Sequence, residues 1–410
     1  MPQVFYGNFD FEHELADAGY NRTGQLERLN AELIAHLLAL AADGDLLFCS
    51  DVGFEEFLAD AQAAGFPSVR PIDSGHRGVF DARLVPWGCS NQAVDFAISR
   101  GWSCETPPVT SVVRANSRHF SFELEQRRRA AIPGAAEVDS LEAVESAIID
   151  AADVWKSRAA EFNWLLKAEF GMSGRERIAG RGANLYDSQS SWIRRRIGAG
   201  VRLFFEPRVY SLCELSTHWC LSDHDFEQDV DAGRLAEPEQ IGTTQLMVDQ
   251  SGQYVGSIPV GHSAIDKPLL GCPEVSLSRE MLGQILSDAC LVTGEARSLG
   301  YHGPISVDSM VYRGPDGEPR LRSIQDVNAR FTMGRIALEW CRRFATSERP
   351  AWLLAPINSL DERGWDAAPD NPVRRLTSPR VVAGRAVRRV GVLLDDPADW
   401  QDLLTTHLRP

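Results

Sequence analysis

The sequence predicts an α/β fold in which an N-terminal parallel sheet is followed by α+β regions. Three observations lead to this prediction. Over the first hundred residues, short apolar runs alternate with segments of helical spacing. After residue 163 strand patterns dominate, and the pair Asp316-Gly317 between two apolar runs is a strong hairpin signal. With 410 residues, the chain also exceeds what one compact core usually holds, which favours two or three subdomains.

The first hundred residues predict the parallel sheet. Leucines recur at helical spacing, an apolar strand follows Gly44, and further helix and strand patterns alternate with short turns. No Gly-x-Gly-x-x-Gly follows the first of these strands, so a classical dinucleotide site is not expected. In chain order, the expected elements are a helix at 26–40, a strand at 46–49, a helix at 54–64, a strand at 68–71 and a helix at 91–100.

The rest of the chain predicts the α+β regions. A crossing segment containing Pro, Thr and Ser is expected at 105–118, and an irregular surface excursion at 355–380, which is rich in Pro, Asp and Arg. Asp139, with Glu142 three residues on, is expected to cap a helix N-terminus. The other expected elements are helices at 119–131, 140–155 and 278–299 and strands at 164–168, 201–206, 209–221, 245–248, 254–259, 304–312 and 320–327.

The composition limits the class of protein. A net charge of −15 argues against nucleic acid or an anionic membrane as the main partner, because either would repel the chain. The eight cysteines include no Cys-x-x-Cys pair and no cluster with zinc-site spacing. The N-terminus does not read as a signal peptide, and no run of about eighteen apolar residues occurs. The sequence therefore predicts a cytoplasmic protein without nucleic-acid or membrane partners.

The predicted hairpin carries a candidate metal site. Asp308 lies on its first strand and Asp326 on its second, and Asn328 and Arg330 follow at the end. Alternation along the strand places Asp326 and Asn328 on one face and Val327 on the other. Two carboxylates and a carboxamide suit Mg²⁺, and an arginine beside them suits a phosphoryl oxygen. On residue types alone, a solvent-facing Asp308 with Asn328 capping a loop fits equally well.

A second feature lies upstream, where Lys167 lies near the end of an apolar strand and a loop follows. The loop contains Gly171, Ser173 and Gly174, so its backbone N–H groups can approach phosphate oxygens while Lys167 adds a positive charge. The segment lacks the Gly-Lys-Ser/Thr ending of a P-loop. An ordinary hairpin loop is the commoner structure for such a pattern when it occurs alone.

A third feature is an apolar strand that stops at Glu206-Pro207, where proline removes a backbone donor. Such a strand end can offer backbone groups to a purine edge, although alone it is only a strand–turn–strand. The chain thus has a lysine strand, a Gly-rich loop, a strand ending in glutamate and a hairpin ending Asp-x-Asn-x-Arg. This order resembles the ATP-grasp superfamily over roughly residues 110–345.

The resemblance implies a role for each of these residues. Lys167 would contact the ATP phosphates, and Arg330 would steady the transferred phosphoryl or acyl group. The stretch Asn116-Ser117-Arg118 resembles the family's Asn-x-Lys element, with Arg118 at the phosphates where lysine is commoner. The remaining nucleotide contacts would be Gly171, Ser173 and Gly174 in the covering loop, Glu206 and Val209 at the adenine hinge, and Glu214 at the ribose. The metal ligands would be Asp308, Asp326 and Asn328, with aspartate twice where glutamate is more usual.

The resemblance also implies a domain organisation and a reaction. A pre-ATP-grasp α/β domain would span 1–112, a small lid subdomain 113–222 and a large subdomain with the C-terminal segment 223–410. The cofactors would be ATP and one or two Mg²⁺ ions, with Mn²⁺ as an alternative. The chain would join a small carboxylate to an amine through an acyl phosphate, releasing ADP and phosphate. Residues 171–182 would form a lid that excludes water.

Several alternatives stay open. The protein could instead be an ATP-grasp phosphotransferase or a non-catalytic nucleotide-binding protein, and a homodimer is an open alternative to a monomer. An amino acid or peptide is the expected amine, with Ser50-Asp51 as a contact point. His218 and His262 are expected to be structural rather than catalytic, because lone histidines beside apolar residues usually are. The arginines at 194–196 are expected on a solvated helix.

Overall fold

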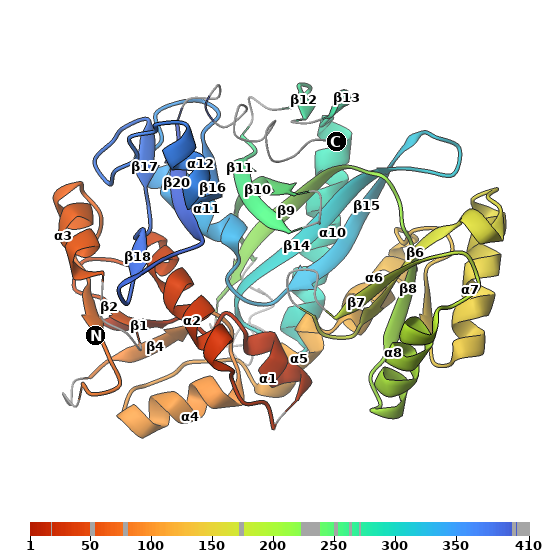
Figure 1. Ribbon diagram of the computed structural model, residues 1–410, viewed down its shortest axis with the longest axis horizontal. Coiled ribbons are helices and arrows are strands. Elements are labelled where there is room, and N and C mark those ends of the chain that lie inside the picture. Colours follow the sequence, from red (N-terminus) through yellow and green to blue (C-terminus); the bar gives the residue numbers. More distant parts are fainter. Residues whose placement is uncertain are drawn as a thin grey trace, which may run out of the picture.

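The computed structural model (Figure 1) arranges the chain as a parallel N-terminal sheet, a large antiparallel sheet and a smaller antiparallel sheet. The described residues are 1–17, 19–49, 54–76, 81–171, 176–222, 238–249, 253–261, 265–269, 272–395 and 399. In Figure 1 the large sheet lies in the middle, with the N-terminal sheet on one side and the small sheet on the other.

The N-terminal sheet has four parallel strands in the order β3-β2-β1-β4, which confirms the predicted parallel sheet. The helix expected at 26–40 is in fact an α-helix followed by a 3₁₀ helix. The strands are β1 (Gln3–Tyr6), β2 (Leu46–Phe48), β3 (Arg70–Ile72) and β4 (Arg83–Pro86). The helices are α1 (Phe11–Ala16), α2 (Gly24–Leu33), η1 (Ile34–Ala39), α3 (Glu55–Ala63) and α4 (Asn91–Arg100).

The small sheet has the order β5-β8-β6-β7, and its strands are antiparallel. Its core includes Trp164, which lies so close to Gly180 that a Cβ there would be 1.9 Å from Cζ2 of the indole. Only glycine therefore fits at position 180. The elements are β5 (Ala136–Val138), α7 (Leu141–Val154), η2 (Ala159–Glu161), β6 (Asn163–Ala168), β7 (Arg177–Arg181), α8 (Asp187–Gly198) and β8 (Leu203–Pro207).

Two expectations for residues 105–155 are wrong. The segment 105–118 contains a helix, α5 (Val109–Asn116), followed by α6 (Arg118–Arg128). Pro108 is the N-cap of α5, where its missing N–H costs nothing. Helix α7 is capped by Ser140 and not by Asp139, because the Ser140 hydroxyl accepts the N–H of Ala143 at 3.0 Å.

The large sheet has the order β15-β14-β9-β10-β11-β16-β20-β17, with antiparallel pairing throughout. The predicted hairpin is confirmed, and Gly317 in its turn has φ = +84°, a conformation that favours glycine. The strands are β9 (Ser211–Leu221), β10 (Glu239–Val248), β11 (Tyr254–Pro259), β14 (Gly303–Arg313), β15 (Pro319–Asn328), β16 (Ala351–Pro356), β17 (Arg374–Leu376) and β20 (Arg389–Leu394).

Two helices, α10 (Arg279–Ser298) and α11 (Met333–Phe344), cover opposite faces of the large sheet. Leu215 packs with Ile285 of α10, whereas His218, three residues further along the same strand, packs against Gly334 of α11. An odd separation along a strand places the two side chains on opposite faces. The face under α11 is the one that carries the candidate site described below.

The segment 355–380 is more regular than expected. It contains the end of β16, the helix α12 (Ile357–Glu362) and strand β17, whose Leu376 is buried. The two remaining strand pairs are β12 (Pro268–Leu269) with β13 (Cys272–Ser276) and β18 (Val381–Val382) with β19 (Arg385–Ala386). Within the described part of the chain, no helix has the length and apolar character needed to cross a membrane. The domain boundaries at 112 and 222 stay a prediction.

Candidate active site

The strand register brings the two predicted metal carboxylates together. Asp308 on β14 lies directly opposite Asp326 on β15, and on its other side it lies opposite Ser216 of β9. Directly paired residues of antiparallel strands share a face, so these three side chains form one row across the sheet. The Ser216 hydroxyl donates to Asp308 Oδ1 at 2.7 Å, and the Asn328 amide donates to Asp308 Oδ2 at 3.0 Å. Val327 is buried on the opposite face, as predicted.

The groups around Asp308 do not fully neutralise a negative charge on its carboxylate. Burial, with a smaller contribution from the nearby carboxylates of Asp326 and Glu214, raises the pKa of this carboxyl to about 7. The hydrogen bond from Ser216 and the charge of Arg330 act in the opposite direction but do not outweigh burial. A divalent cation between Asp308 and Asp326 would supply the missing positive charge.

The donor set fits Mg²⁺. Among the described residues no group of three or more His, Cys, Asp and Glu side chains could hold a metal, so the candidate set is two carboxylates and the Asn328 carboxamide. Oxygen donors of this kind suit a hard cation, and water and nucleotide phosphates complete such sites. In this conformation the Asn328 oxygen accepts from Arg330 at 2.8 Å, and the amide nitrogen is the atom that faces Asp308.

Arg330 is held by a residue that sequence reasoning missed. Its Nε and Nη2 donate to Glu12 Oε1 at 3.0 and 2.9 Å, and its Nη1 donates to the carbonyl of Phe331 at 3.1 Å. Glu12 belongs to α1 and lies 318 residues away in sequence. No local pattern around Glu12 indicates this partner, so only the tertiary structure reveals that the N-terminal region reaches the candidate site.

Lys167 lies in a buried cluster of four charged side chains. Its Nζ lies 2.5 Å from Glu206 Oε2, and Arg322 Nη2 lies 2.8 Å from both Glu206 Oε1 and Glu125 Oε2. Side chains of Arg322, Glu125 and Glu206 are only 2%, 1% and 7% exposed. Sequence reasoning missed Glu125 and Arg322, which come from α6 and β15.

The charges of this cluster set the ionisation of its members. Burial alone would raise the pKa of Glu206, but Arg322 and Lys167 outweigh it and hold that pKa far below the usual value. For Glu125, burial dominates over Arg322 and raises the pKa to about 7. Burial also lowers the pKa of Lys167, although the Glu206 carboxylate opposes this. A nucleotide phosphate could replace Glu206 as the partner of Lys167, since Arg322 would still neutralise Glu206.

Arg118 lies between the small sheet and the carboxylate row. Its Nη1 donates to the carbonyl of Ala168, the residue after Lys167, and its Nη2 lies 3.6 Å from Asp326 Oδ2. The Arg118 backbone N–H also donates to the carbonyl of Glu169 at 3.1 Å. The structure thus brings Arg118 next to both the lysine strand and a predicted metal carboxylate.

The residues predicted to bind adenine and ribose lie on β8, on β9 and in the turn between these two strands. Val209 is in the turn between β8 and β9, where it packs against a small cluster that includes Met310. Glu214 is on β9 opposite Met310, and burial raises its pKa while the charge of Lys167 lowers it. The side chain of Glu206 points into the charged cluster, so only its backbone remains available to a purine edge.

Other predicted residues divide into three groups. Gly171 is described, whereas Ser173, Gly174, Ser50, Asp51 and His262 lie outside the described residues. His218 is structural: it is buried, hydrogen bonded to Thr244 at 3.0 Å and Thr332 at 3.3 Å, and burial lowers its pKa to about 3. The arginines at 194–196 lie on α8, where Ile193 is buried and Arg196 pairs with Glu176, as expected for a solvated helix.

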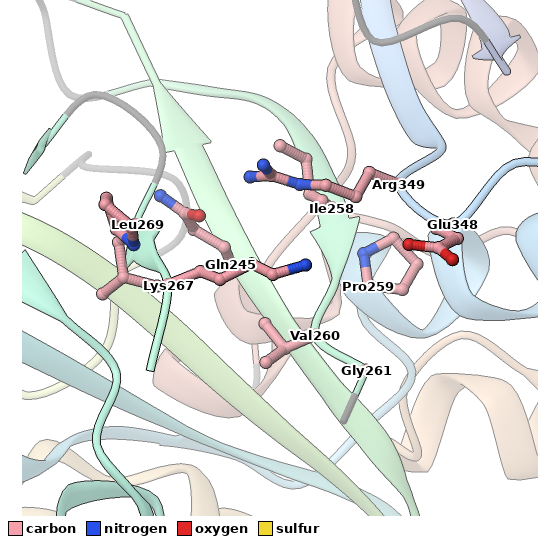
Figure 2. Close-up of a pocket in the computed structure, with 10 residues that line it drawn as sticks. Gln245, Ile258, Pro259, Val260, Gly261, Lys267, Leu269, Glu348 and Arg349 are labelled. Atoms are coloured by element: carbon pink, nitrogen blue, oxygen red, sulfur yellow. The ribbon is translucent and has the colours of Figure 1, made fainter. Parts of the chain in front are cut away.

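A separate pocket lies beside β10 and β11 (Figure 2). Gln245, Pro259 and Leu269 line it, and Lys267 and Arg349 extend into it from opposite sides. None of the predicted nucleotide or metal residues contributes to its walls. This pocket is therefore distinct from the candidate active site.

The chain has the ATP-grasp fold, with a parallel N-terminal sheet followed by a small and a large antiparallel sheet. No protein-family model and no curated protein sequence matches the chain.

Several solved structures are similar to this chain over nearly its whole length. The N5-carboxyaminoimidazole synthetase from Staphylococcus aureus complexed with ADP has a TM-score of 0.53 and 8% identity, covering 98% of this chain and 95% of that chain. The N5-carboxyaminoimidazole ribonucleotide synthetase from Thermus thermophilus has a TM-score of 0.51 and 12% identity, with coverages of 100% and 99%. The biotin carboxylase domain of Hydrogenobacter thermophilus 2-oxoglutarate carboxylase, in complex with MgADP, ADP and bicarbonate, has a TM-score of 0.52 and 12% identity, with coverages of 99% and 90%. At these identities the likeness concerns the fold.

Proposed function

We propose that this protein is an Mg²⁺-dependent ATP-grasp ligase that activates a small carboxylate as an acyl phosphate and transfers the acyl group to an amine. The observation that carries the proposal is the convergence of Asp308, Asp326 and Asn328 from the large sheet with Lys167 and Arg118 from the neighbouring small sheet and the helix before it. Two carboxylates and three cationic or amide groups at one junction suit a metal–triphosphate complex.

Each residue of the candidate site would have its own role in binding or catalysis. Lys167 and Arg118 would bind the phosphates, Glu214 the ribose, and the backbone of Glu206 and Val209 the adenine. Asp308, Asp326 and Asn328 would hold Mg²⁺, which when bound supplies positive charge to the β- and γ-phosphates. Arg330 would stabilise the transferring group electrostatically. The predicted lid at 171–182 would exclude water from the acyl phosphate through the residues before β7, of which 172–175 lie outside the described residues.

The similar solved structures support the nucleotide part of this proposal. One is complexed with ADP, and another with MgADP and bicarbonate, a small carboxylate-like anion. The amine acceptor is expected to be an amino acid or a peptide. A phosphotransferase, in which the phosphorylated acid is the product, is the second candidate from the same fold, and a non-catalytic nucleotide-binding protein is the third.

Hydroxylamine trapping tests the proposal directly. The purified protein is incubated with Mg²⁺-ATP, hydroxylamine and a panel of small acids that includes bicarbonate and amino acids. We expect ADP release and hydroxamate formation with at least one organic acid, because hydroxylamine intercepts an acyl phosphate. A stable phosphorylated acid that accumulates without an amine would instead identify a phosphotransferase. Nucleotide binding without turnover across broad acid and amine pools would refute the ligase.

Substitutions test the site assignment. Asp326→Ala and Asn328→Ala should each remove most Mg²⁺-ATP turnover, since they delete predicted metal ligands. Glu32→Gln, which changes a surface pair on α2, is the matched control and should leave turnover intact. Unchanged turnover in both site variants would disprove the metal assignment.

A further inference from the structure

A continuous set of side-chain contacts joins the N-terminal region to the metal carboxylates. Glu12 of α1 accepts two hydrogen bonds from Arg330, and Arg330 Nη2 also donates to Asn328 Oδ1 at 2.8 Å. Asn328 Nδ2 then donates to Asp308 Oδ2 at 3.0 Å, and Ser216 occupies the other oxygen of Asp308. The order of the contacts is therefore Glu12, Arg330, Asn328, Asp308 and Ser216.

Both ends of the Glu12–Arg330 pair have fixed backbones. Asn116 at the end of α5 donates its Nδ2 to the Ala329 carbonyl at 3.2 Å and accepts the Ala329 N–H at 3.0 Å. Phe11, which precedes Glu12, is fully buried, and its ring lies 5.9 Å from the Arg330 guanidinium carbon. The remaining freedom at Arg330 lies in its side chain, which the Glu12 carboxylate restrains.

The Glu12–Arg330 pair is sheltered from solvent. The two side chains are only 11% and 13% exposed, so the carboxylate neutralises the guanidinium with little screening by water. Without Glu12, the positive charge of Arg330 would stay uncompensated beside the Asn328 oxygen and free to approach Asp308. It would then repel a divalent cation and compete with it for the carboxylate.

We infer that Glu12 is a positioning residue of the metal site, which neutralises Arg330 and holds its guanidinium beside Asn328, so that the Asp308 carboxylate remains available to Mg²⁺. This inference rests on the proposed function, because it assigns Mg²⁺ to Asp308, Asp326 and Asn328. It also gives the N-terminal region a direct part in the active site. Glu12 acts through Arg330 and Asn328 and does not itself contact the metal.

Calorimetric titration with ADP, with and without Mg²⁺, tests the inference without requiring turnover. For Glu12→Ala we expect the Mg²⁺-dependent gain in ADP affinity to weaken roughly tenfold, the scale seen when partners of metal ligands are removed. The affinity for ADP in EDTA should not change. Glu12→Gln should lose less, because its amide oxygen still accepts from Arg330. Glu105→Ala, which removes an exposed ion pair with Arg83, should match the wild type.

A double-mutant cycle separates positioning from a general structural role. Because Glu12 acts through Arg330, Glu12→Ala should have no effect on Mg²⁺-dependent ADP binding in the Arg330→Ala background. An equal effect in both backgrounds would overturn the inference, and so would equal losses of ADP affinity with and without Mg²⁺. Failure of the wild type to show any Mg²⁺-dependent ADP binding would instead contradict the proposed function.

Discussion

At the scale of single residues, the chain buries several ionisable groups in very different ways. Asp308 is buried beside other carboxylates, and its raised pKa identifies a position that a cation would stabilise. His36 is buried next to the edge of Trp352, and neither of its ring nitrogens has a hydrogen-bond partner among the described residues. The first arrangement serves a predicted ligand, whereas the second belongs to the core. Burial alone therefore does not identify a functional group.

His36 should make the fold sensitive to acid. Burial lowers its pKa to about 3, whereas an unfolded histidine titrates near 6.5. Above about pH 6.5 both states are neutral and folding carries no penalty. As the pH falls from about 6.5 toward 3, the unfolded state binds a proton that the folded state does not, so stability falls by about 1.4 kcal/mol per pH unit for this group.

Replacement of His36 by leucine should reduce that dependence. We expect His36→Leu to retain or raise stability at about pH 7, because it removes an unsatisfied buried imidazole, and to show a shallower loss between about pH 6.5 and 5. Urea unfolding at a series of pH values measures both effects. Ile98→Val, at an exposed position on α4, changes no titrating group and should keep the wild-type slope. An identical slope for His36→Leu would contradict the assignment of a neutral buried histidine.

At the scale of elements, strand β15 contains exposed residues, buried residues and residues of the candidate site. Arg320 is 41% exposed and pairs with Asp316 in the hairpin turn, whereas Arg322 is 2% exposed and pairs with Glu125 and Glu206. The strand then ends at Asp326 and Asn328. Glu125 comes from α6 and Glu206 from β8. The ion pairs of Arg322 therefore connect the large sheet to the small sheet next to Lys167, the lysine predicted to contact the phosphates.

Loss of Arg322 should destabilise the protein strongly. Arg322→Met would leave the carboxylates of Glu125 and Glu206 facing each other in a buried site with only Lys167 to compensate them. We expect a loss of about 3–5 kcal/mol in the free energy of unfolding, as for other broken buried ion pairs. Denaturant unfolding measures it. Arg320→Met on the same strand is the matched control and should change stability little, so equal effects of the two variants would disprove the buried-cluster argument.

At the scale of the whole molecule, the architecture could largely be predicted from local patterns. Alternating helix and strand signals predict the parallel sheet, and Asp316-Gly317 predicts the hairpin that places Asp308 opposite Asp326. These predictions succeed because turn chemistry and strand alternation act over a few residues. Helix α5 could not be predicted in this way, because Pro107-Pro108 and the following Val and Thr residues resemble an extended segment, although proline is well suited to a helix start.

The rest of the site depends on contacts between distant parts of the chain. Glu12 and Arg330 are 318 residues apart, and Glu125 and Arg322 are 197 residues apart. Neither glutamate belongs to a motif, and each looks like an ordinary surface residue of a helix in the sequence. Their roles follow from how the helices pack against the large sheet, which no local pattern encodes. The residues proposed to bind a ligand therefore belong to local motifs, whereas the residues that hold them do not.

Since the proposed site joins two sheets, its ligand should stabilise the whole fold. We expect Mg²⁺-ADP to raise the midpoint of thermal unfolding. A ligand that binds only the folded state and is present at about 100 times its dissociation constant adds about 2.7 kcal/mol to the free energy of unfolding. EDTA should remove most of the increase. Asp308→Asn should behave as the wild type does in EDTA, since it deletes one charged metal ligand, whereas Asp316→Asn in the exposed turn should respond like the wild type. A thermal shift of equal size with and without metal would mean that the nucleotide binds without Asp308 and Asp326, and the carboxylate row would then need another role.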